Sequence, residues 1–178
     1  VSLEKKSAYE AVYWPSGQDL TFSLLGALGL IAGCVLSFRG SIAQMLVSLL
    51  GLLAGLSLGA GAVLRWKAKK PSAAFSVFVV LFYVAKLFRD FRHWEINPAI
   101  LDYCFSLFAM IAFMLASYHA GAFSFERGAR RRLAFYSLLG VLFGAISLAG
   151  AQLPELLIYA GSVFWMLACA QQMLRRSV

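Results

Sequence analysis

The stretch SIAQMLVSLLGLLAGLSLGAGAVL, which covers residues 41–64, contains no charged side chain. As an α-helix with a rise of about 1.5 Å per residue, a run of this length crosses the roughly 30 Å hydrocarbon core of a bilayer. Its apolar and polar residues do not alternate, as they would in the strand of a membrane β-barrel. The stretch therefore predicts a transmembrane helix.

Five more apolar runs lie on either side of this one. Together the predicted helices cover residues 20–38, 41–64, 72–88, 98–118, 133–153 and 154–173. Of the 178 residues, 61% are hydrophobic and 13% are charged, whereas soluble domains are about 45–50% apolar and about 25% charged. The sequence therefore predicts an all-α integral membrane protein, in which residues 1–178 form one transmembrane domain of about six helices.

The 16 lysines and arginines lie between the apolar runs in an alternating pattern. Cytoplasmic loops are enriched in these residues, so the more basic side is expected inside the cell. With six spans, that side holds Lys5, Lys6, Arg65, Lys67, Lys69, Lys70, Arg127, Arg130, Arg131, Arg132, Arg175 and Arg176. The other side holds only Arg39, Lys86, Arg89 and Arg92. Both termini are therefore predicted to be cytoplasmic.

Two basic clusters on the predicted inner side favour contact with anionic lipid headgroups, at about 1 kcal/mol per charge. Their members are Arg65, Lys67, Lys69, Lys70, Arg130, Arg131 and Arg132. A net charge of +8 is also typical of proteins that bind nucleic acid. We do not expect such binding, because the basic residues lie in short clusters between apolar runs instead of sharing one surface with aromatic residues.

The segment KLFRDFRHWEINPAILDY, residues 86–103, places charge on the predicted outer side. Ionisable groups at membrane depth cost about 2.5–3.5 kcal/mol each at a helix centre, so they usually face a polar cavity or each other. On a helix, Lys86 shares a face with Arg89 and can pair with Asp90. We predict a net cationic pocket for an anionic or zwitterionic solute, formed by Lys86, Arg89, Arg92, His93, Asp102 and Tyr103. The alternative is an ion-pair network that closes this end of the bundle.

Small residues repeat at helical spacing. Gly51, Gly55 and Gly59 are four residues apart, which lets the backbones of two membrane helices approach closely. The same spacing separates Gly29 from Gly33 and Gly140 from Gly144. The face with Gly51, Gly55 and Gly59 either packs within the chain or docks a second membrane subunit or a second copy.

Motifs for catalysis or metal binding are weak. Ser57 lies in a formal G-x-S-x-G match, but in a helix and not at the strand–turn–helix elbow that this motif needs. Only His119 could reach it at a similar depth, and no acidic residue would orient that histidine. The cysteines form no C-x-x-C pair, and no cluster has the spacing of metal ligands. We therefore expect no enzyme, no metal and no cofactor.

The stretch FRHWEINPAILDYCFSLFAMIAFMLASYHAGAF, followed by RGARRRLAF, resembles a group of small polytopic bacterial membrane proteins with no assigned activity. This resemblance implies the bacterial cytoplasmic membrane. In size and span number the chain is similar to the substrate-binding subunits of energy-coupling-factor vitamin transporters, which dock on a coupling subunit through small-residue helix faces. No substrate motif of those subunits is present.

These patterns lead to one functional expectation and one alternative. We expect a small-solute membrane transport protein, or a subunit of one, with an outward-facing polar site. The alternative is a non-catalytic membrane sensor, assembly factor or scaffold in which the charged segment is structural.

Overall fold

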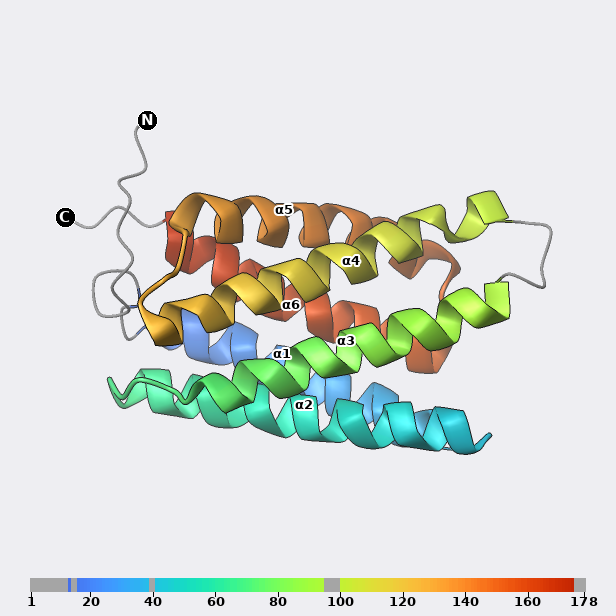
Figure 1. Ribbon diagram of the computed structural model, residues 1–178, viewed down its shortest axis with the longest axis horizontal. Coiled ribbons are helices and arrows are strands. Elements are labelled where there is room, and N and C mark those ends of the chain that lie inside the picture. Colours follow the sequence, from blue (N-terminus) through green and yellow to red (C-terminus); the bar gives the residue numbers. More distant parts are fainter. Residues whose placement is uncertain (1–12, 14–15, 39–40, 95–99, 175–178) are drawn as a thin grey trace.

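The computed structural model describes residue 13 and residues 16–38, 41–94 and 100–174. In this part of the chain there are six α-helices and no strand (Figure 1). They are α1 (Gly17–Leu36), α2 (Ile42–Trp66), α3 (Ala73–Trp94), α4 (Ile100–Ala122), α5 (Arg130–Ser147) and α6 (Leu153–Leu174). Two short 3-10 turns follow α4 and α5, at Phe123–Phe125 and Leu148–Gly150. The prediction of an all-helical fold with six helices is confirmed.

Successive helices run in opposite directions and pack on their neighbours in the chain, and α6 completes the ring by packing on α1 (Figure 1). The side chain of Gln171, near the end of α6, donates a hydrogen bond of 2.8 Å to Gln18 at the start of α1. We call this the basic end of the bundle, because it also carries Arg65 and the loops with the two basic clusters. The opposite end, where α3 finishes, is called the Lys86 end.

Within the described residues, five helices are long and apolar enough to cross a membrane, which fits a multi-pass membrane protein. The exception is α3, because Lys86, Arg89 and Asp90 lie in its last turns. However, Lys70 before α3 and Glu126 after α4 form an ion pair of 3.4 Å at the basic end. A chain that leaves this end along α3 and returns along α4 must traverse the bundle twice. If α4 crosses the bilayer, α3 crosses it as well.

The backbones of α1 and α6 come very close together where they close the ring. A Cβ atom added to Gly161 of α6 would lie 2.7 Å from the carbonyl oxygen of Gly26 and 2.7 Å from the nitrogen of Leu30. A Cβ atom added to Gly29 would lie 2.8 Å from the Cα of Gly161. Only glycine fits at these positions, and the backbones of α1 and α6 therefore touch. In lipid, such backbone packing replaces the hydrophobic driving force that joins helices in water.

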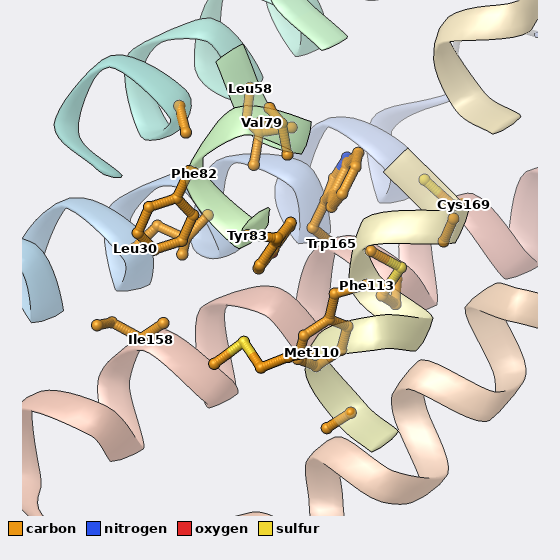
Figure 2. Packing of buried hydrophobic residues seen from close by; sticks show 14 of the residues in the cluster. Leu30, Leu58, Val79, Phe82, Tyr83, Met110, Phe113, Ile158, Trp165 and Cys169 are labelled. Carbon is orange, nitrogen blue, oxygen red and sulfur yellow. The ribbon is translucent and has the colours of Figure 1, made fainter. Parts of the chain in front are cut away.

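The centre of the ring is filled by large side chains (Figure 2). Phe82 and Tyr83 of α3 are fully buried and lie among Leu30 of α1, Phe113 of α4 and Trp165 of α6. The rings of Tyr83 and Phe113 are 5.5 Å apart. This aromatic plug occupies the middle of the bundle, so the two ends are separated by packed side chains.

A hydrogen bond ties the plug to α6. The hydroxyl of Tyr83 donates to the hydroxyl of Ser162 at 2.8 Å, and Ser162 donates to the carbonyl of Ile158 at 2.7 Å. Both polar groups are thus satisfied inside an apolar core, where an unpaired hydroxyl would be costly.

The helices extend beyond the apolar runs at several ends. The third run was expected to end at residue 88, whereas α3 continues to Trp94, and α5 begins at Arg130 and not at residue 133. Charged residues continue these helices because they find partners there. Asp90, which lies past the expected end of the third run, accepts from Lys86 at 2.6 Å, and the Nε of Arg130 donates to the carbonyl of Met173 at 2.6 Å. Apolarity alone therefore marks the membrane-embedded part of a helix and not its end.

Candidate functional site

Two cations of α3 share one buried carboxylate at the Lys86 end. The Nζ of Lys86 donates to Asp90 Oδ2 at 2.6 Å, and the two residues are only 1% and 4% exposed. Arg89 donates to the other oxygen, Oδ1, from Nη2 at 2.7 Å and from Nε at 2.9 Å. The helix brings Lys86 to Asp90 because residues four apart lie on the same face, and Arg89 reaches Asp90 as its neighbour in the sequence.

Helix α6 supplies the opposing wall. Glu155, in its first turn, places a carboxylate oxygen 3.9 Å from Nη2 of Arg89. One turn further, the ring of Tyr159 lies 5.9 Å from Nζ of Lys86, within the range of a cation–π contact. The ammonium group of Lys86 is therefore held between a carboxylate and an aromatic face.

A cavity of about 260 Å³ lies beside these charges, between α1, α2, α3 and α6. Its floor is buried and includes Cys34, Phe82 and Lys86, whereas Leu36 and Gln152 at its rim are exposed. The remaining wall consists of Ser37, Gln44, Val47, Ser48, Arg89, Pro154, Glu155 and Ile158. Ligand pockets usually measure about 300–1,000 Å³, so this cavity suits a small solute.

The structure brings two of the six predicted site residues to this cavity, Lys86 and Arg89. Arg92 is exposed on α3, and Tyr103 is half-buried on α4, and neither lines the cavity. The backbone of His93 lies in α3 and that of Asp102 in α4, but their side chains are outside the described part of the structure.

Sequence reasoning missed the polar residues that come from other helices. Gln44 and Ser48 are four apart on α2, and Gln152 and Glu155 lie at the start of α6. The first pair was visible as two polar positions on one face of an apolar run. The position of α6 opposite α3 was not visible, because it depends on the order of the helices around the ring.

Among the described residues, the charged side chains that line the cavity are Lys86, Arg89 and Glu155. Asp90 pairs with Lys86 and Arg89 but does not line the cavity. The pocket was expected to be net cationic. That stays an expectation, because the side chains of His93 and Asp102 lie outside the described part of the structure. The carboxylate of Glu155 beside the two cations supplies an acceptor for the ammonium group of a zwitterionic solute. The ion-pair network that was the alternative is also present, with the cavity next to it.

The basic end is closed more tightly. Arg65 lies 3.3 Å from Asp19 and donates to the hydroxyl of Ser23 at 3.0 Å, and its guanidinium is 5.7 Å from the ring centre of Tyr13. The cavity beside Arg65 measures only about 40 Å³. Of these two cavities inside the ring, the one at the Lys86 end is therefore the larger.

The proposed docking face on α2 is occupied by the same chain. A Cβ atom on Gly51 would meet Cys34 Sγ and would lie 2.7 Å from Phe82, and one on Gly55 would lie 2.6 Å from Ile31. At Gly59 the nearest atom, on Ala27, is 3.7 Å away. Gly51 and Gly55 thus serve packing within the bundle.

The weak catalytic and metal signals gain no support among the described residues. Ser57 donates to the carbonyl of Leu53 at 2.7 Å, and His119 stacks on the ring of Tyr136 with 5.3 Å between ring centres. No group of three or more His, Cys, Asp or Glu side chains is arranged to hold a metal in the described part of the chain.

Comparison of the chain with family models, with curated proteins and with solved structures found no match. The function must therefore be argued from the geometry of the bundle.

Proposed function

We propose that this chain is a small-solute membrane transport protein, or the solute-binding subunit of one, and that it binds a small zwitterion in the cavity at the Lys86 end. The observation that carries the proposal is the cavity of about 260 Å³ walled by Lys86, Arg89 and Glu155. Charged residues inside a membrane bundle usually face a polar cavity that has a function.

The wall has the donors and acceptors that a zwitterion needs. A guanidinium group has five N–H donors, and Asp90 accepts from Nε and Nη2 of Arg89, so the guanidinium keeps further donors that can bind a solute carboxylate. Glu155 can accept from an ammonium group, and Gln44 and Ser48 add neutral hydrogen-bonding groups. The buried position of Lys86 strengthens its attraction for an anionic group, because the effective dielectric constant there is low.

Helix α3 connects the two ends of a possible path. It contributes Phe82, Lys86 and Arg89 to the larger cavity and Phe75, Ser76 and Val79 to the small cavity at the basic end. Between them lie Phe82 and Tyr83, so transport requires these rings to move. With the basic end inside the cell, the present conformation is open outward and closed inward.

A structural role without transport remains the second candidate. The observation in its favour is that Lys86 and Asp90 already satisfy each other at 2.6 Å without a solute. A clasp of this kind would hold α3 straight at its charged end and would make the cavity incidental.

The test uses purified protein in detergent and a panel of amino acids and betaines as zwitterionic probes. We expect at least one of them to raise the melting temperature of the wild type and not that of Glu155→Gln. Ser48→Leu, which puts a larger side chain in the cavity wall, should abolish the shift too, and Arg131→Gln at the opposite end should keep it. A panel that leaves the wild type unchanged, or shifts all variants equally, contradicts the proposal and favours the clasp.

A further inference from the structure

A second hollow lies on the outside of the bundle, in the groove between α3 and α4 at the basic end. It has a volume of about 640 Å³ and an apolar lining. Val77 and Leu81 of α3 form one side, and Tyr118 and Phe125 form the other, and all four are exposed. Arg127 lies in the lining where the groove reaches the end of the bundle.

The groove is built into the fold. Its floor is narrow because Gly121 of α4 meets Ser76 of α3, where an added Cβ atom would lie 2.8 Å from Ser76 Cβ. At the basic end of the groove, two contacts join the loops on either side. Ser124 donates to the carbonyl of Pro71 at 3.3 Å, and Lys70 pairs with Glu126 at 3.4 Å. The second contact also offsets the negative charge next to Arg127.

We propose that this groove binds one acyl chain of an anionic phospholipid, with the lipid phosphate at Arg127. The length of the groove supports a lipid. On α3 its lining runs from Ala73 to Leu81, which at 1.5 Å per residue is about 12 Å. This is close to half of the roughly 30 Å hydrocarbon core, the depth of one leaflet.

A partner helix would need a contact face along the whole length of the bundle, which the groove does not provide.

The charge around the groove supports an anionic headgroup. Arg127 is joined at this end by Lys67, Lys69, Arg131 and Arg132, all exposed. The lipid would come from the leaflet on the basic side, and the site is independent of the solute cavity at the other end.

The experiment measures the lipid that stays bound to the purified protein after exchange into mixed micelles with equal amounts of phosphatidylglycerol and phosphatidylcholine. Native mass spectrometry counts each lipid. The wild type should retain phosphatidylglycerol in preference. Arg127→Gln should lower that preference about fivefold, the loss expected for one basic charge at a headgroup, and Arg131→Gln should change it less.

A second pair of variants tests the apolar part. Val77→Trp fills the groove and should remove the retained lipid, whereas Leu142→Trp, at an exposed site on α5, should not. Equal retention in these two variants, or no preference for phosphatidylglycerol in the wild type, would overturn the proposal. So would a wild-type dimer in light scattering that Val77→Trp dissociates, because a second copy would then be the occupant.

Discussion

Lys86 is almost completely buried, and its ammonium group lies 2.6 Å from Asp90. Removing one partner of a buried ion pair leaves the other charge without compensation, whereas removing both can be nearly neutral. Arg89 also binds Asp90 and would keep part of the compensation. The loss of stability on removing Lys86 therefore depends on how well Arg89 still compensates the charge of Asp90.

We expect Lys86→Met to lower the free energy of unfolding by roughly 3 kcal/mol, the low end of the range for a broken buried pair, because Arg89 still neutralises Asp90. The double variant Lys86→Met with Asp90→Leu should recover most of this loss. Denaturant titration of the purified protein in detergent measures both. If the single variant is as stable as the wild type, Lys86 does not form a stabilising pair.

At the scale of the helices, the packing of α1 on α6 depends on direct contact between their backbones. Gly161→Ala places a methyl group 2.7 Å from backbone atoms of Gly26 and Leu30. We expect it to lower the melting temperature clearly, since overpacking costs about 1–3 kcal/mol and backbone atoms cannot yield as a flexible side chain does.

Gly61→Ala is the matched control, because an added Cβ atom there meets nothing within 4 Å. In a helix, alanine is favoured over glycine by about 0.5–1 kcal/mol, so this variant should be neutral or slightly more stable. Thermal unfolding of the two variants under the same conditions compares their stabilities. A Gly161→Ala protein as stable as Gly61→Ala would mean that the ring is not closed by direct backbone contact.

The helices themselves could be predicted from sequence, because each membrane helix needs an apolar run long enough to cross lipid. The arrangement around the ring could not. Lys86 and Arg89 were found because they are close in sequence and share a helical face. Glu155 and Gln44 were missed because α6 and α2 face α3 only through the packing of the whole bundle. The glycine contact of Gly26 with Gly161 was missed for the same reason, since it joins two helices far apart in the chain.

At the scale of the whole molecule, the ends of the bundle differ in charge. Of the described lysines and arginines, only Lys86, Arg89 and Arg92 lie at the Lys86 end, and the others gather at the basic end. Because positive loops stay in the cytoplasm, this distribution predicts the orientation. It also predicts that α3 spans the bilayer, with the buried Lys86 and Asp90 inside the bundle.

Single cysteines in a background without Cys34, Cys104 and Cys169 test this orientation. We expect Lys69→Cys and Arg131→Cys to be shielded from a membrane-impermeant maleimide in intact cells, and Gln152→Cys to react. After the membrane is permeabilised, all three should react, which controls for local burial. Reaction of the first two from outside would reverse the orientation, and a different result for Lys69→Cys and Arg131→Cys would mean that α3 and α4 do not both cross.

The hydrogen bond between Gln18 and Gln171 places the first helix and the last helix side by side at the same end of the ring. The six helices thus form a closed ring in which every helix packs on two neighbours. Helices α6 and α1 differ from the other neighbouring pairs only because no loop joins them. Circular permutation is tolerated where termini are close together. A short linker from α6 to α1, with new termini in the loop between α4 and α5, should therefore give a rearranged gene whose product forms the same bundle.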